Sequence, residues 1–502
     1  MSAASGVAPR AFYRPHRNVQ TAPSAQSATL VWLSAVGGSL ALLGLFAAHQ
    51  ATLLRIAVPG VASAVALTLY LRRPIAYIHF TLWAWFIAPL VRRVIDWKFG
   101  FADQNLVLLA PFLVSAIAAL TVIREGRRAP RVNLTPYLLC TAGVVYGFLV
   151  GVIRWKLHVA SSESIASVIY GLFMWLAPLV FGLHLHLRWR NYEEDKSAIL
   201  ASFKWGVLLL GAYGVYQYVV APAWDCAWLD GVMTGDGNAS FGRPSPYEIR
   251  VWSTSNSPGT FATIMLAGLI LLIGMRSKVK IVAAGVGYLS FLLSQVRTAW
   301  LGWILSVAFM AVGSKGATLR RFLLGILVLP VCLLPLMLNP RIEQSVQDRL
   351  DTMQDVGHDD SFQDRADMYR LVTLELFHEP SGRGLMNSNV SVDGMALDSG
   401  ILQVVLMLGI IGAALFSAGI AIGCFSMFRG GYGGYGSGLS PERTAFRALF
   451  LALLAESISG NNFVNINGAI FWTLFGLWMA ASVQEESAAV LVTNHNPRAV
   501  LA

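Results

Sequence analysis

The chain has 502 residues, of which 56% are hydrophobic and 13% are charged, and its mean hydropathy is +0.59. A protein of this composition could not stay dissolved in water, so a soluble globular protein is excluded. The net charge of +10 does not indicate nucleic-acid binding, because the basic residues are scattered over short connections between apolar runs.

A helix that crosses the hydrocarbon core of a membrane needs about 20 mostly apolar residues. Such runs are predicted at about 29–49, 54–71, 74–91, 104–123, 136–153, 164–186, 198–220, 256–275, 279–295, 298–313, 321–338, 399–427, 444–460 and 466–483. The sequence therefore predicts an all-α, polytopic membrane protein with about 14 spans. A transmembrane domain over 29–483 would lie between tails at 1–28 and 484–502.

The distribution of charge predicts how these spans are oriented. When charges at span ends are counted with the adjacent connection, the even-numbered connections and both tails hold 22 Lys and Arg against 7 Asp and Glu. The odd-numbered connections hold 14 against 19. Because basic residues accumulate on the cytoplasmic side, both termini are expected in the cytoplasm. The two long loops, at about 221–255 and 339–398, are then expected on the outer face.

Residue patterns typical of disulfide, metal or nucleotide chemistry are missing from the sequence. Three of the four cysteines lie in apolar runs, and His358 and His378 are too isolated to form a metal-ligand pattern. Neither HExxH, nor a P-loop, nor GxGxxG in a strand and helix context is found. We therefore expect no metal and no cofactor.

Three arginines on the predicted outer face are candidates for binding an anion. Arg250 lies in YEIRVWSTSNSPGTFA, Arg297 in SQVRTAWLGW, and Arg365 in a helix predicted over 361–377. Arg365 falls on the apolar face of that helix, where a guanidinium could face a cleft and an anionic ligand. The plainer alternatives are a snorkelling stem for Arg365, an interfacial anchor for Arg297 and a solvated loop residue for Arg250.

Two acidic residues complete the candidate site: Asp398 just before one predicted span and Glu456 near the end of another. Asp398 and Ser399 precede the apolar run at 399–427, where a helix N-cap is their ordinary role. The same position would also hold the Asp398 carboxylate at the water boundary. Glu456 is an ionisable residue inside a span and is followed by an Asn-rich stretch that includes Asn462. We expect this stretch to form a polar re-entrant turn that lines a cavity.

The order of these parts resembles the superfamily of O-antigen ligases and of O-antigen or exopolysaccharide polymerases. The resemblance covers roughly residues 245 to 415 and rests on RVWSTSNSPGTFA, SQVRTAWLGW, SFQDRADMYR, HEPSGRGL and DSGILQVVLMLGIIG, in that order. It implies an all-helical fold related to the membrane glycosyltransferases of the C type (GT-C). It also implies a bacterial inner-membrane protein that acts at the periplasmic face on glycans carried by undecaprenyl diphosphate.

The resemblance also implies roles for individual residues. Arg297 and Arg365 match two arginines of the family that bind the carrier diphosphate, and Arg250 would assist them. Ligases usually have a His-Asn pair where this chain has Asp398 and Ser399, which favours a polymerase. A sugar hydroxyl would attack an anomeric carbon while the diphosphate leaves, so cations can stabilise the developing charge without a metal. Asp398 would orient or deprotonate that hydroxyl.

The expected substrate contacts and partners follow from this hypothesis. Glu456 and Asn462 would bind the glycan. The partners would be the undecaprenyl-diphosphate-linked glycan, membrane lipid, and assembly proteins such as a flippase or a chain-length regulator, with no nucleic acid. Two alternatives stay open: a ligase that transfers the glycan to lipid A core, and a transporter or flippase in which Glu456 and the arginines bind the cargo.

Overall fold

The computed structural model describes residues 25–102, 105–126, 132–158, 164–232, 241–275, 277–312, 360–385, 391–392, 395–396, 399–429 and 441–495. Helices dominate these residues, and the strands among them are one antiparallel pair, β1 (Ser391–Val392) and β2 (Met395–Ala396). The all-α class is therefore confirmed for the described part of the chain.

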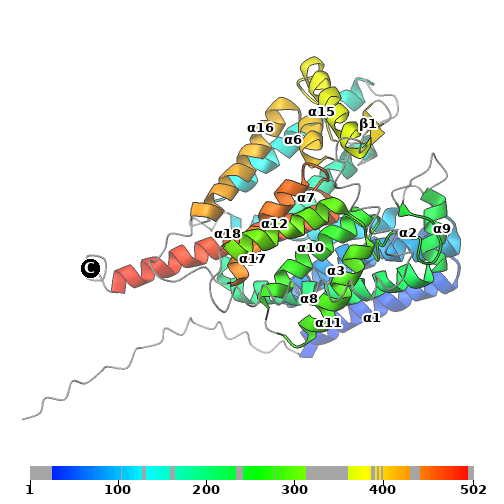
Figure 1. The fold of residues 1–502 in the computed structure, drawn as a ribbon. Helices are drawn as coiled ribbons and strands as arrows, with labels where there is room; N and C mark the ends of the chain where they lie inside the picture. The colour runs from blue at the N-terminus through cyan, green and yellow to red at the C-terminus, as the bar shows by residue number, and fades with distance from the viewer. Residues whose placement is uncertain are drawn as a thin grey trace, which may run out of the picture.

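The first half of the chain forms a run of helices that starts at the edge of the molecule (Figure 1). Their bounds are α1 (Ala25–Ala47), α2 (Ala51–Arg72), α3 (Pro74–Phe99), the 3-10 helix η1 (Leu106–Leu109), α4 (Ala110–Ala116), α5 (Ala119–Glu125), α6 (Thr135–Lys156), α7 (Ile165–Leu187), the 3-10 helix η3 (Trp189–Asn191), α8 (Tyr192–Val220) and α9 (Ala223–Val232). The apolar run predicted at 104–123 is thus a broken stretch of η1, α4 and α5.

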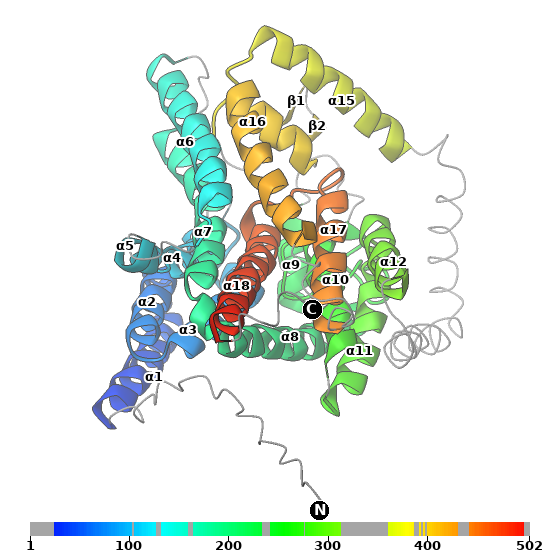
Figure 2. The same ribbon diagram turned by 90° about the vertical axis from the view of Figure 1, so that its left-hand side faces the viewer.

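The second half packs back against the first. Its helices are α10 (Pro258–Gly274), α11 (Val279–Leu293), α12 (Arg297–Val312), α15 (Asp360–His378), α16 (Gly400–Arg429), α17 (Pro441–Glu456) and α18 (Asn465–His495). In Figure 2, α16 lies beside α6, α18 beside α7, and α11 meets α8. Early and late segments of the chain therefore form one bundle.

Nine helical stretches in the described residues are long and apolar enough to cross a membrane: Thr29–Ala47, Ala51–Arg72, Pro74–Phe99, Leu106–Glu125, Thr135–Lys156, Ile165–Leu187, Trp189–Val220, Gly400–Phe428 and Asn465–Glu485. This is the pattern of a multi-pass membrane protein. The run predicted at 321–338 lies outside the described residues, and each other predicted run coincides with a described helix or with the broken stretch. A total of fourteen spans stays a prediction.

The depth of burial differs sharply among these helices. In α18, 89% of the residues in its most apolar 18-residue segment are buried inside the protein, whereas none are buried in the corresponding segment of α1. The helices α10 and α11 have only 17 and 15 residues. At 1.5 Å per residue they are about 22 to 26 Å long, less than the roughly 30 Å of a hydrocarbon core. Their ends therefore lie within the thickness that longer neighbours span.

The helix α16 is interrupted at Gly409, where the segment that follows α15 enters it. Gly409 has φ +62° and ψ −176°. The N–H of Ile410 donates to the carbonyl of Pro380 at 2.9 Å, and the N–H of Arg383 donates to the carbonyl of Leu406 at 2.8 Å. The inserted segment thus satisfies backbone groups that the break leaves unpaired, as a broken helix at membrane depth requires.

Gly409 cannot be replaced by a residue with a side chain without strain. Its backbone angles are accessible almost only to glycine, and a Cβ would overlap the carbonyl of Ser381. We expect Gly409→Ala to destabilise the protein by about 2 kcal/mol, measured by thermal unfolding in detergent. The control is Gly285→Ala in α11, where a Cβ would meet nothing within 4 Å. Equal stability of the two variants would contradict this account of the break.

Candidate functional site

Three of the segments that carry predicted site residues meet at one end of the bundle. The N–H of Gly400, at the start of α16, donates to the carbonyl of Gly460 at 3.2 Å, and the N–H of Ile401 donates to the carbonyl of Ser457 at 3.1 Å. Above them, α15 lies across the N-terminal end of α16 (Figure 2). The start of α16, the turn after α17 and the loop helix α15 are therefore neighbours.

The loop that precedes α10 is held by a buried arginine of α3. The guanidinium of Arg93 donates to the carbonyl of Ser255 at 2.7 Å and to that of Ser253. Its Nε lies 3.1 Å from Oδ1 of Asp225 in α9, and both side chains are fully buried. Because a buried charge needs a partner, this ion pair fixes α3, α9 and the loop relative to one another.

Further donors surround the carboxylate of this ion pair. Asp225 accepts hydrogen bonds from Nε2 of Gln217 at 2.7 Å and from the hydroxyl of Tyr213 at 2.9 Å. The Oε1 of Gln217 in turn accepts from the N–H of Ser253 at 2.8 Å. Burial raises the pKa of Asp225 above its ordinary value, while the guanidinium of Arg93 and the two donors act to lower it. The network is a structural junction that shapes the loop.

Arg250 stabilises the turn between α11 and α12. Its Nη2 donates to the carbonyl of Gln295 at 2.9 Å and to that of Ser294 at 3.2 Å. Gln295 has a left-handed backbone, with φ +55°, and the half-buried Arg297 begins α12 two residues later. A helix N-terminus carries partial positive charge and favours anions. This corner, defined by Arg250, Arg297 and the N-terminus of α12, is called the arginine corner below.

Glu456 ends α17 and is buried, with 7% of its surface exposed. Its Oε2 lies 3.4 Å from Nδ2 of Asn462, and its Oε1 has no hydrogen-bond partner among the described residues. Gly302 of α12 leaves room for the carboxylate, since a Cβ there would lie 3.1 Å from Oε1. Arg297 and Gly302 lie on different faces of α12, because a five-residue step turns a helix by about 140°.

The Asn-rich stretch between α17 and α18 is a non-helical turn at 457–464. Its asparagines bond to the protein itself. Nδ2 of Asn461 donates to Oε1 of Gln403 at 2.5 Å, and Nδ2 of Asn462 donates to the carbonyl of Leu453 at 2.8 Å. The polar turn is therefore present, and Asn462 acts first as a neighbour that positions Glu456.

The helix predicted over 361–377 is present as α15. Val372 is buried and Asp367 and Arg370 are exposed, so the helix has one buried and one exposed face. The hydroxyl of Tyr369 donates to the carbonyl of Ile458 at 3.2 Å. The side chain of Arg365 lies outside the described residues, so its role stays a prediction.

The residue that caps α16 is Ser399. Its Oγ accepts the N–H of Leu402 at 3.4 Å and lies 3.1 Å from the hydroxyl of Tyr369. Asp398 lies outside the described residues, and its predicted catalytic role is not tested. The hydroxyl pair Tyr369 and Ser399 nevertheless ties α15 to the start of α16.

Several charged residues that hold the site together did not stand out in the sequence. Arg93 belongs to a charged stretch at the end of a predicted span, which is the ordinary place for a topogenic charge. The predicted apolar run ended at residue 91, but α3 continues as a helix to Phe99. Arg93 therefore lies inside a helix and is buried in the protein. The end of α15 is held in a similar way, because Arg154 of α6 pairs with Glu379 at 2.7 Å.

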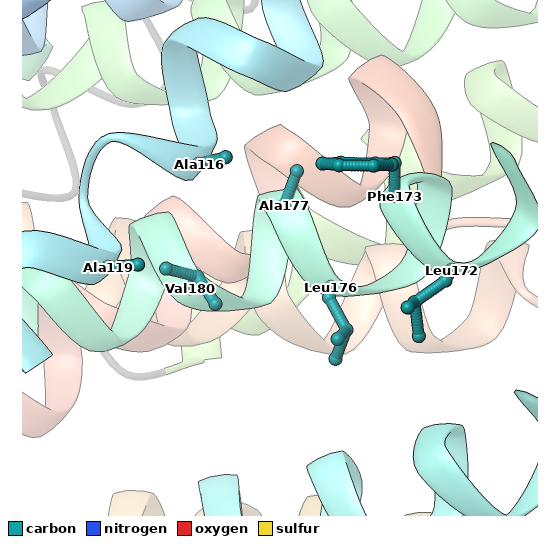
Figure 3. Close-up of a pocket in the computed structure, with 7 residues that line it drawn as sticks. All are labelled: Ala116, Ala119, Leu172, Phe173, Leu176, Ala177 and Val180. Atoms are coloured by element: carbon teal, nitrogen blue, oxygen red, sulfur yellow. The ribbon is translucent and has the colours of Figure 1, made fainter. Parts of the chain in front are cut away.

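An apolar pocket of about 180 Å³ lies where α4 and α5 meet α7 (Figure 3). Its lining residues are Ala116, Ala119, Leu172, Phe173, Leu176, Ala177 and Val180. None of these side chains can bind a phosphate or a sugar, so the pocket is suited to hydrocarbon. Among the described residues, no group of three or more His, Cys, Asp and Glu side chains could hold a metal ion.

The buried ion pair makes a direct prediction about stability. Asp225→Ala leaves the guanidinium of Arg93 buried without its carboxylate, which should cost about 3 to 5 kcal/mol. The matched control is Glu193→Ala, which removes an exposed carboxylate that pairs with Lys196 and should cost less than about 1 kcal/mol. Thermal unfolding of the purified variants measures both. A loss for Asp225→Ala as small as that of the control would mean that the junction does not support the fold.

The chain was also compared with models of protein families and with curated proteins. No family model matches it, and no curated protein does.

Proposed function

We propose that the chain is a polysaccharide polymerase that joins undecaprenyl-diphosphate-linked oligosaccharide repeat units at the periplasmic face of the bacterial inner membrane. The arginine corner is the observation that carries this proposal. Arg297 is the first residue of α12, and Arg250 donates to the carbonyl of Gln295 just before it; two arginines at a helix N-terminus suit a diphosphate. A bundle of apolar helices suits the polyprenyl carrier. Exopolysaccharide and O-antigen repeat units are the substrates in view.

The two residues with undescribed side chains fit the same site in this proposal. Arg365 lies in α15, four residues before Tyr369, whose hydroxyl lies 3.1 Å from Oγ of Ser399. Asp398 immediately precedes Ser399 in the chain. The contact between α15 and the start of α16 supports assigning Arg365 to the diphosphate and Asp398 to the acceptor.

The proposed reaction is a displacement at the anomeric carbon of the donor. An acceptor hydroxyl forms the new C–O bond, and the bond from the anomeric carbon to the diphosphate breaks, with its electron pair going to the diphosphate oxygen. The carboxylate of Asp398 takes the hydroxyl proton. Arg297 and Arg365 stabilise the negative charge that develops on the leaving group, with Arg250 assisting. The step requires no cofactor or metal.

Glu456 is proposed to contact the glycan. Its free Oε1 can accept a hydrogen bond from a sugar hydroxyl, because a carboxylate oxygen only accepts. Asn462 supports it by donating to Leu453 and lying beside Oε2. A sugar hydroxyl would thereby supply a partner for Oε1, while Asn462 remains the partner of Oε2.

The decisive test is a chain-length assay with the purified protein. Incubation in detergent with lipid-linked repeat units should give glycans of many repeat units without any added energy source. Transfer to lipid A core, with no elongation, would instead identify a ligase. Movement of the lipid-linked glycan across a vesicle membrane, with neither transfer nor elongation, would identify a transporter. Either of these last two results would overturn the polymerase.

Arg365→Lys tests the assignment of the diphosphate-binding groups. Lysine keeps the charge but loses the planar pair of donors that binds an anion at two points. We expect the elongation rate to fall by about 100-fold, measured in the same assay. The control is Arg370→Lys, which changes an exposed arginine of the same helix and should leave the rate unchanged. A full-length polymer at the normal rate in Arg365→Lys would remove Arg365 from the site.

A further inference from the structure

A second buried arginine, Arg447 of α17, lies outside the proposed site. Its side chain is 7% exposed, and both Nε and Nη2 are buried without a hydrogen-bond partner in the described chain. The remaining exposed fraction of the residue connects it to the outside of the protein. An unpaired buried cation is strongly unfavourable. The guanidinium of Arg447 therefore needs a hydrogen-bond acceptor, and the described residues supply none for Nε and Nη2.

Two aromatic rings from neighbouring helices surround this guanidinium. The Cζ of Arg447 lies 4.9 Å from the ring centroid of Trp478 in α18 and 5.7 Å from that of Phe428 in α16. The rings stabilise the cation but accept no hydrogen bond in the plane of the guanidinium. Trp478 adds a second donor, because its buried Nε1 also has no acceptor among the described residues. Two donor side chains thus lie together without any acceptor.

The position of this donor pair along the helices matches a membrane boundary. Arg443, one turn of α17 earlier, forms an ion pair with Glu485 of α18, and Glu485 ends the apolar stretch of α18. Arg447 therefore lies about 6 Å inside that ion pair, and Trp478 lies about 10 Å inside it. Tryptophan is enriched at this depth, where lipid headgroups meet hydrocarbon. The C-terminal part of α18 projects out of the bundle (Figure 1).

We propose that Arg447 and Trp478 bind the phosphate of an anionic phospholipid in the leaflet at this end of the bundle. A phosphodiester offers only acceptors, which two unpartnered donors require, and its negative charge balances the buried guanidinium. The apolar rings of Phe428 and Trp478 favour a phosphate that carries acyl chains over free phosphate in water. Arg443 is already paired with Glu485, so Arg447 is the cation left for the headgroup. The site is independent of the proposed polymerase activity.

The test measures lipid binding by the purified full-length protein. Native mass spectrometry during titration with dioleoylphosphatidylglycerol should show a bound lipid at about ten-fold lower concentration than with zwitterionic dioleoylphosphatidylcholine. Arg447→Gln should abolish that preference. Arg370→Gln, which removes an exposed charge from α15, should retain it. Inorganic phosphate at the same concentration as the lipid should not compete.

The alternatives give different results. An unchanged preference for phosphatidylglycerol in Arg447→Gln would overturn the site, and competition by inorganic phosphate would show a free-anion site instead. Should Arg447→Gln fail to fold, Arg447→Lys keeps the charge but loses the planar donors and should weaken the preference by several-fold. A full preference in Arg447→Lys would then overturn the role of the guanidinium.

Discussion

Buried polar groups in a membrane bundle must find their partners within the protein, because the hydrocarbon around it offers none. The ion pair of Arg93 and Asp225 meets this constraint for two charges at once. It also uses the remaining donors of Arg93 on the carbonyls of the loop before α10. The break at Gly409 follows the same rule, since the inserted segment supplies the missing backbone partners. The candidate site depends on both, because they fix the loop before α10 and the path that leads from α15 into α16.

The sequence predicted the helices well because an apolar run of sufficient length has few other structures available to it. The amphipathic α15 was equally readable, since burial of Val372 and exposure of Arg370 follow from the periodicity. The break in α16 was not, because Gly409 lies in an unbroken apolar run. The segment that enters the break is the one that follows α15, at residues 380–384, and hydropathy carries no information about such contacts.

The candidate site was predictable by residue type and only partly by geometry. Arg250, Arg297 and Glu456 stood out because charges at span ends and inside spans are costly. The hydrogen bonds of Arg250 to the carbonyls of Ser294 and Gln295 depend on the left-handed backbone of Gln295. No residue pattern in the sequence predicted that backbone. For the same reason the sequence could not show that Glu456 contacts the face of α12 that carries Gly302, about 140° away from Arg297.

The lengths of α10 and α11 explain how polar groups can lie within so apolar a protein. Because α10 and α11 are too short to reach both surfaces, a loop or turn at one end of each lies below the ends of longer neighbours such as α8. In the proposed polymerase, the carrier would stay in the hydrocarbon while its diphosphate meets Arg297 at the bilayer boundary. Near the N-terminal end of α17, Arg447 lies one turn inside the ion pair of Arg443 and Glu485. Buried charged side chains, Glu456 and Arg447, therefore lie near both ends of the described part of α17.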